Sequence, residues 1–122
     1  MPQQTTFTAN HRLASYGTLA PGRSNHAQVE HLSGRWIKGT VRGTATTNTT
    51  GRWTGYPGFH LHADGEPVSV FILESSDLTD HWDRLDVFEG EAYARVVTTA
   101  QTDEGPLQVC VYELRRPLDS SC

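Results

Sequence analysis

One carboxylate occupies a position that could support acid–base chemistry. In the segment from Ser75 to Phe88, which reads as a helix, side chains placed at about 100° per residue bring Leu78, Trp82 and Leu85 into one narrow apolar stripe. Glu89 falls at the centre of that stripe, directly before Gly90. Burial and the negative end of the helix dipole both favour the protonated form of a carboxyl group, as a general base working near neutral pH requires. The alternative is structural: at a frayed helix end Glu89 could reach solvent or pair with Arg95.

A second feature is the abrupt end of a short strand at Tyr16-Gly17-Thr18-Leu19. A glycine at a strand end lets the backbone turn sharply and leaves amide N–H groups without strand partners. Such groups can bind a carboxylate or an oxyanion. The alternative here is an ordinary turn between a strand and a helix.

A third pattern, His60-x-His62 followed by Glu66, resembles half of the first cupin motif. Alternate positions of a strand place both imidazoles on one face, as a metal site would need. The glycines of that motif are misplaced and no second motif with another histidine follows, so the alternative is the exposed face of a hairpin.

The elements that must position these residues are short. We expect strands at Arg12–Tyr16, Arg35–Thr47, Phe59–His62, Val68–Leu73, Tyr93–Thr102 and Leu107–Leu114, and helices from Ser24 or Asn25 to about Leu32 and from Ser75 to Phe88. The third and fourth strands are joined by a turn at Asp64-Gly65, and the last two form a hairpin. Gly39 and Gly43 indicate bends within the second strand. Together they predict an α+β fold, a small, mixed and partly closed β-barrel flanked by two helices.

Length and charge narrow the function class. The 122 residues fit one domain, predicted at residues 12–116 between a flexible N-terminal tail (1–11) and a C-terminal tail (117–122). Ten basic against fourteen acidic side chains give a net charge of −4, which argues against nucleic-acid binding. No apolar run approaches the roughly 20 residues needed to span a bilayer, and the N-terminus lacks the pattern of a signal peptide, so we expect a cytoplasmic protein with no membrane partner. Cys110 reads as a buried thiol and Cys122 as a free terminal one.

The ordered motifs resemble the gamma-glutamylcyclotransferase-like family, with the compact gamma-glutamylamine cyclotransferases as the most similar members. The resemblance rests on Tyr16-Gly17-Thr18-Leu19, Asn25-His26, Gly55-Tyr56-Pro57-Gly58, Leu85-Asp86-x-x-Glu89-Gly90-x-x-Tyr93-x-Arg95 and Val111-Tyr112. It covers roughly residues 12–114, and the string around Glu89 is its most specific part.

The resemblance implies a barrel with a cavity and an enzyme that uses no metal or organic cofactor. Such enzymes cleave a small γ-glutamyl amide by internal attack and release 5-oxoproline and an amine or amino acid. Glu89 would be the general acid/base, the amides of Gly17, Thr18 and Leu19 would bind the carboxylate or oxyanion, Tyr16 would form a pocket wall and Tyr93 would donate a hydroxyl. The assembly would be a monomer or homodimer. Two other classes stay open: a non-catalytic binding module of the same fold, and a cupin-like metal enzyme using His60, His62 and Glu66.

Overall fold

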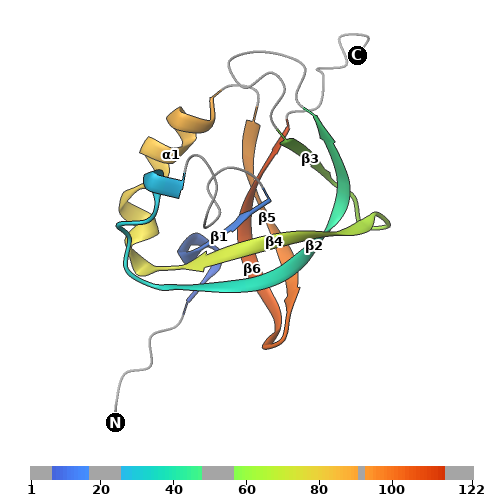
Figure 1. Ribbon diagram of the computed structural model, residues 1–122, viewed down its shortest axis with the longest axis horizontal. Coiled ribbons are helices and arrows are strands. Elements are labelled where there is room, and N and C mark those ends of the chain that lie inside the picture. The colour runs from blue at the N-terminus through green and yellow to red at the C-terminus, as the bar shows by residue number, and fades with distance from the viewer. Residues whose placement is uncertain (1–6, 17–25, 48–56, 91–92, 115–122) are drawn as a thin grey trace.

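A computed structural model describes residues 7–16, 26–47, 57–90 and 93–114 (Figure 1). Its strands are β1 (Arg12–Ser15), β2 (Arg35–Thr47), β3 (Pro57–Leu61), β4 (Glu66–Glu74), β5 (Tyr93–Thr102) and β6 (Gly105–Leu114). Helix α1 spans Trp82–Glu89, and short 3₁₀-helices span Ala9–His11, His26–Gln28 and Ser76–Asp80. The predicted strands are all present, and the bounds of β2 and β5 agree with the prediction.

Five of the strands close into a barrel. The sheet order is β3-β2-β4-β1-β6-β5, and a further pairing of β2 with β5, at Gly39↔Thr102 and Thr40↔Gln101, completes the ring. The pairs are antiparallel except β1–β6, which is parallel with Leu13 opposite Cys110. The mixed barrel that the sequence predicts is therefore confirmed, and it is closed rather than partly closed.

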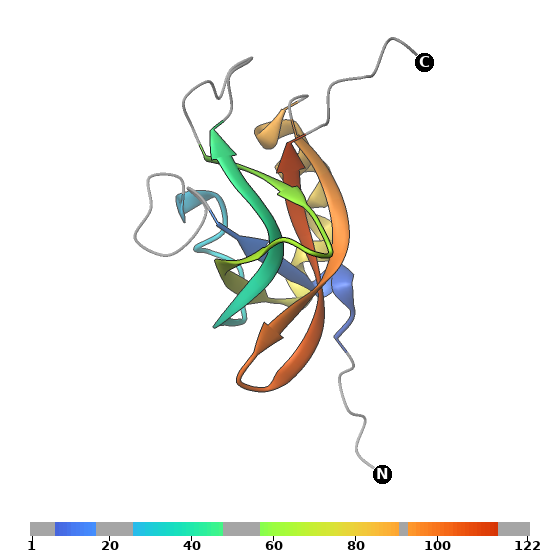
Figure 2. The same ribbon diagram turned by 90° about the vertical axis from the view of Figure 1, so that its right-hand side faces the viewer.

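Strand β3 is the extra strand, and its pairing corrects the predicted β3–β4 hairpin. Both strands pair with β2 instead: β4 along residues 35–43, and β3 along residues 43–47 on the opposite edge. Gly43 meets Leu61 on one side and Glu66 on the other, and a Cβ there would overlap the His60 carbonyl oxygen and the Phe59 ring. In both views β3 and the turn of the β5–β6 hairpin lie at opposite ends of the barrel (Figures 1 and 2).

The helices are shorter than predicted. The segment from Ser75 to Phe88 forms two separate helices. The Ser75 side chain accepts a hydrogen bond from Asp77 N at 3.1 Å, and a 3₁₀-helix starts there. At His81 the backbone then leaves the helical region, with φ at −121°. Of the helix predicted up to Leu32, the described part contains only the 3₁₀ turn His26–Gln28. Within the described residues, one α-helix rather than two flanks the barrel.

Two apolar clusters lie on either side of the barrel wall. The inner cluster takes residues from every strand: Ala14, Ile37, Val41, Phe59, Val70, Ile72, Ala100, Val109 and Val111. The outer cluster lies between the wall and the helices: Leu13, Val29, Leu32, Leu73, Leu78, Trp82, Leu85, Tyr93, Cys110, Tyr112 and Leu114. Trp82 and Leu85 are buried in this interface, as predicted. The alternation of β6 between the two clusters is the period of two that a half-buried strand shows.

Residues 9–11, predicted as tail, lie against the barrel. Trp82 Nε1 donates to the Asn10 carbonyl at 2.9 Å, the buried Cys110 thiol donates to Ala9, and Ser75 N donates to His11. These bonds make the short N-terminal 3₁₀-helix part of the folded domain. Among the described residues no helix has both the length and the apolar character needed to cross a membrane.

Candidate functional site

Glu89 is the last residue of α1, where the chain turns out of the helix. Gly90 follows at φ +86° and its N–H closes the final turn on the Asp86 carbonyl. Leu78 and Leu85 are fully buried and Trp82 nearly so, while Glu89 is half-buried. Trp82 and Leu85, and Leu78 in the preceding 3₁₀-helix, are therefore buried as predicted, whereas Glu89, predicted at the centre of the stripe, is half-buried at the end of α1.

Tyr16 directly follows β1 and is held from two sides. Its hydroxyl donates to the Tyr112 carbonyl oxygen at 2.5 Å, and its ring centroid lies 5.4 Å from that of Phe59. Burial raises the pKa of the Tyr16 phenol well above its ordinary value, and the nearby Tyr93, Glu89 and Glu113 raise it further. Two other predicted site residues, Glu89 and Tyr93, therefore lie close enough to Tyr16 to act on its phenol electrostatically.

A second phenol, that of Tyr112, is hydrogen-bonded to helix α1. Its hydroxyl donates to Asp86 Oδ1 at 2.6 Å, and Arg95 Nε contacts the same oxygen at 3.2 Å. The Arg95 guanidinium lies over the Trp82 ring, 4.3 Å from its centroid. Burial raises the pKa of Tyr112, and the hydrogen bond to Asp86 and the charges of Asp86 and Glu89 add to that effect. The structural alternative for Glu89 was an ion pair with Arg95. In the structure Arg95 pairs with Asp86, one helical turn before Glu89.

These contacts indicate what the site can do chemically. Both phenols are held in the protonated form, so they act as hydrogen-bond donors and not as bases. The half-buried Glu89 carboxylate is the group beside them that can accept and return a proton. The Asp86–Tyr112–Arg95 contacts fix the helix that carries it.

Three of the predicted site residues, Gly17, Thr18 and Leu19, lie outside the described residues, and so does Cys122. The sequence reading assigned no role to Asp86, Tyr112 or Glu113. Glu113 could have been found from the last strand, because its side chain points to the same face of the strand as those of Val109 and Val111.

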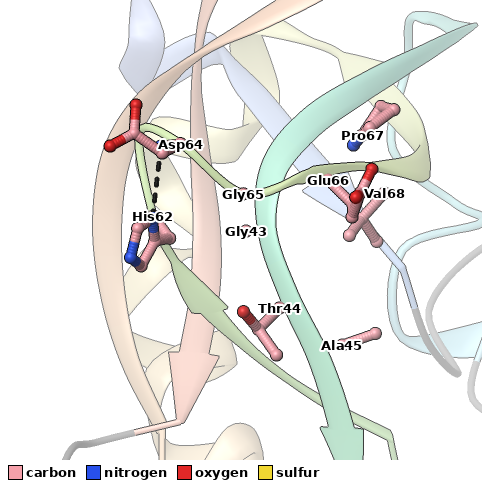
Figure 3. A pocket seen from close by; sticks show the side chains of 9 residues that line it. All are labelled: Gly43, Thr44, Ala45, His62, Asp64, Gly65, Glu66, Pro67 and Val68. Carbon is pink, nitrogen blue, oxygen red and sulfur yellow. Dashed lines mark hydrogen bonds between the residues drawn. The ribbon is translucent and has the colours of Figure 1, made fainter.

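Two residues of the histidine motif lie beside an open groove of about 650 Å³ between β2 and the β3–β4 connection (Figure 3). His62 and Glu66 line the groove and His60 does not. His62 Nδ1 accepts the Asp64 N–H at 3.2 Å, and His60 Nδ1 is buried without a hydrogen-bond partner. No three His, Cys, Asp or Glu side chains of the described ranges are grouped to hold a metal ion, so His60, His62 and Glu66 do not form the site that the cupin-like alternative requires.

Comparison with solved structures supports the fold. Over 86% of this chain, YkqA from Bacillus subtilis matches with a TM-score of 0.67 and 21% identity, and the match spans only 36% of that protein. A mouse AIG2-like protein matches over 88% of this chain and 80% of its own length, with a TM-score of 0.64 and 22% identity. An Arabidopsis thaliana protein matches over 91% of this chain and 72% of its own length, with a TM-score of 0.66 and 20% identity.

Sequence comparison gives the family. No curated protein matches the chain. The family model described as gamma-glutamyl cyclotransferase, AIG2-like, matches residues 13–121. This range contains β1 from its second residue, every later strand and the helix that carries Glu89. The chain therefore belongs to the AIG2-like gamma-glutamyl cyclotransferase family.

Proposed function

We propose that this protein is a γ-glutamyl amide cyclotransferase that uses Glu89 as its general acid/base. The observation that carries the proposal is that Glu89 of α1 and Tyr93 of β5 act electrostatically on the phenol of Tyr16, which follows β1. The family resemblance supplies the reaction class, and it assigns the amides of Gly17, Thr18 and Leu19 to the substrate's carboxylate or oxyanion.

The proposed reaction is an internal acyl transfer. Glu89 takes a proton from the α-ammonium of the substrate, and the free amine attacks the δ-carbonyl carbon of the same molecule. The new C–N bond closes the five-membered ring of 5-oxoproline, and the amide C–N bond to the leaving amine breaks. Glu89 returns its proton to the leaving nitrogen, and the second proton of the attacking nitrogen ends on the released ammonium. Because nucleophile and electrophile share one molecule, ring closure has the entropic advantage of an intramolecular reaction.

The tyrosines have supporting roles in this proposal. The Tyr16 hydroxyl is already committed to the Tyr112 carbonyl, so Tyr16 forms a pocket wall of fixed position. Tyr93 is nearly buried and supplies a phenol next to it. The chemistry consists of proton transfers and one acyl transfer, which side chains and backbone amides can perform.

The first test is direct. Purified protein is incubated with a panel of γ-glutamyl amines and γ-glutamyl dipeptides, and 5-oxoproline is measured by mass spectrometry. We expect 5-oxoproline with at least one class of leaving amine.

The second test isolates Glu89. Glu89→Gln keeps the size and shape of the side chain and cannot act as a base, so we expect a folded protein that binds substrate with kcat lower by roughly 10²–10⁴. The matched control is Asp83→Asn, the same change on the exposed face of α1, which should leave kcat unchanged. Near-normal 5-oxoproline release by Glu89→Gln would rule out the assigned role.

The non-catalytic alternative predicts a different pattern. A binding module of this fold would bind γ-glutamyl ligands in calorimetry, and neither the wild-type protein nor Asp83→Asn would release 5-oxoproline from any member of the panel.

A further inference from the structure

Glu113 occupies a place in β6 where the sequence pattern calls for an apolar residue. Val109 and Val111 are fully buried in the inner cluster, and Cys110, Tyr112 and Leu114 belong to the outer one. Since successive side chains of a strand alternate between its faces, Glu113 continues the inward-facing phase of the two valines. It is half-buried, one residue before the end of β6.

The contacts of Glu113 agree with this position. Its Oε2 accepts the backbone N–H of Leu61, in the extra strand β3, at 2.8 Å. Leu61 packs against the inner cluster, and Phe59, two residues earlier in β3, contacts the Tyr16 ring. A backbone N–H therefore holds the Glu113 carboxylate on β3, the strand whose Phe59 ring contacts Tyr16.

Glu113 is also adjacent to the Tyr16 hydroxyl. That hydroxyl bonds to the carbonyl of Tyr112, the peptide group directly before Glu113, and the charge of Glu113 acts on the phenol, as that of Glu89 does. Tyr112 in turn holds Asp86, one turn of α1 before Glu89. The charges of two carboxylates from different elements, Glu89 and Glu113, thus act on the same phenol.

We infer that Glu113 is a second substrate-binding carboxylate, which anchors the α-ammonium group of the γ-glutamyl substrate while Glu89 transfers the proton. The inference rests on the proposed function and extends it to one further residue. A γ-glutamyl head group enters as an ammonium ion with three N–H donors, and a charged group that leaves water needs a compensating partner. A carboxylate accepts several hydrogen bonds, so the Leu61 N–H and a substrate ammonium can share it. With one carboxylate as anchor and one as base, the amine stays oriented after it loses its proton.

The test compares two ligands that differ only in the amine. In a Glu89→Gln background, which prevents turnover, γ-glutamyl propylamide and its desamino analogue N-propylglutaramate are titrated by calorimetry. Adding Glu113→Gln should weaken binding of γ-glutamyl propylamide by roughly 10–100-fold, the value of a hydrogen bond to a charged group. Binding of N-propylglutaramate should change less than about twofold. Glutamine keeps an oxygen that can accept the Leu61 N–H, and thermal melting checks that the fold is intact.

Glu66→Gln, a change of the same type at an exposed position in the other groove, is the control and should affect neither ligand. Equal weakening of both ligands by Glu113→Gln would show a structural role and overturn the inference. So would unchanged binding of γ-glutamyl propylamide, or the absence of binding before Glu113 is changed.

The activity measurement separates this inference from the proposed function. In the wild-type background Glu113→Gln should raise KM roughly 10–100-fold with kcat nearly unchanged, whereas Glu89→Gln lowers kcat. The wild-type protein could make no 5-oxoproline while Glu113→Gln still weakens binding of γ-glutamyl propylamide and not of N-propylglutaramate. In that case the proposed function is wrong and the binding role of Glu113 is supported. If 5-oxoproline forms and KM does not change, the anchor fails and the proposed function stands.

Discussion

Asp86 stands one turn before Glu89 on α1. Asp86 is bound by the Tyr112 hydroxyl and the Arg95 guanidinium. Asp86→Asn keeps an oxygen for Tyr112 and loses only the charge opposite Arg95, in a pair that is partly exposed. We therefore expect kcat/KM to fall less than about tenfold, against the 10²–10⁴ expected for Glu89→Gln, and stability to fall by about 0.5–1 kcal/mol. Urea unfolding and the 5-oxoproline assay measure both quantities, and equal kinetic losses in the two variants would indicate a general need for negative charge.

The raised pKa values of Tyr16 and Tyr112 have a consequence for stability at high pH. In the unfolded chain both phenols ionise near pH 10, while in the folded protein burial keeps them protonated. Their contribution is therefore fully present below pH 10 and is lost as the pH rises above it. We expect the free energy of unfolding to fall by about 1.4 kcal/mol per pH unit for each of the two phenols.

Tyr16→Phe tests this assignment. Urea unfolding at pH 9, 10 and 11 should show about half the wild-type slope in the variant, together with a loss of about 1 kcal/mol at pH 7 from the missing hydrogen bond to Tyr112. An unchanged slope would mean that Tyr16 does not titrate on unfolding.

At the scale of residues, the sequence predicted positions within one helix or strand, and it did not predict contacts between side chains of different elements. The burial of Trp82 and Leu85 followed from their spacing along one helix. The contacts of Asp86 with Tyr112 and of Glu113 with Leu61 join residues 26 and 52 positions apart, so they depend on strand pairings that a local pattern does not contain.

The presence of each strand could be predicted from the sequence, because alternating apolar residues mark a half-buried strand. Which strands pair with one another could not be predicted in this way. The short connection at Asp64-Gly65 is typical of a hairpin, but β2 is long enough to bind β4 with its first part and β3 with its last part. The break in the helix at His81 was not predicted, because the helical spacing of apolar residues continues on both sides of His81. The Ser75 side-chain cap starts a 3₁₀-helix before that break.

Gly34 directly precedes the long strand β2 and gives a prediction at the level of elements. Its φ is +140°, and a Cβ would overlap the Glu74 carbonyl oxygen and approach Ser75 Cβ to 3.0 Å. Gly34→Ala should therefore cost roughly 3 kcal/mol or more, from backbone strain and from displacement of the end of β4. Gly105→Ala is the control, because φ is +96° there with no atom within 4 Å, so strain alone should cost about 1–2 kcal/mol. Thermal unfolding compares the two, and equal losses would show that the close approach is relieved at no cost.

Across the whole molecule, one buried carboxylate joins distant parts of the barrel. Glu74 in β4 binds Arg12 of β1 and Arg35 of β2, each at 2.9 Å, and Arg35 continues to Glu104, in the turn between β5 and β6, through two bonds of 2.7 Å. Burial would raise the pKa of Glu74, but the hydrogen bonds from Arg12 and Arg35 outweigh it and hold the pKa below its ordinary value. The stabilisation is present above the unfolded pKa, near 4.3, and is lost as the pH falls through the lower folded value.

Glu74→Gln should lower the free energy of unfolding by roughly 3 kcal/mol at pH 7, because it leaves Arg12, only 12% exposed, without its carboxylate. The difference from wild type should shrink as the pH is lowered below 4. Glu104→Gln changes the exposed end of the same network and should cost less than about 1 kcal/mol. Denaturant unfolding from pH 3 to pH 7 measures both, and a pH-independent difference for Glu74→Gln would contradict the assignment.

The parallel pairing of β1 with β6 also bears on how the protein folds. The first strand finds both of its neighbours late in the chain: Arg12 bonds to Glu74, 62 residues on, and Tyr16 to Tyr112, 96 residues on. Contacts of such long range slow folding, because loop-closure entropy is lost before they form. The local β5–β6 hairpin and helix α1 can form before barrel closure, whereas the neighbourhood of Tyr16, Glu89 and Glu113 exists only after it. During refolding, any activity of this site should therefore recover with the slowest phase, after the secondary structure has returned.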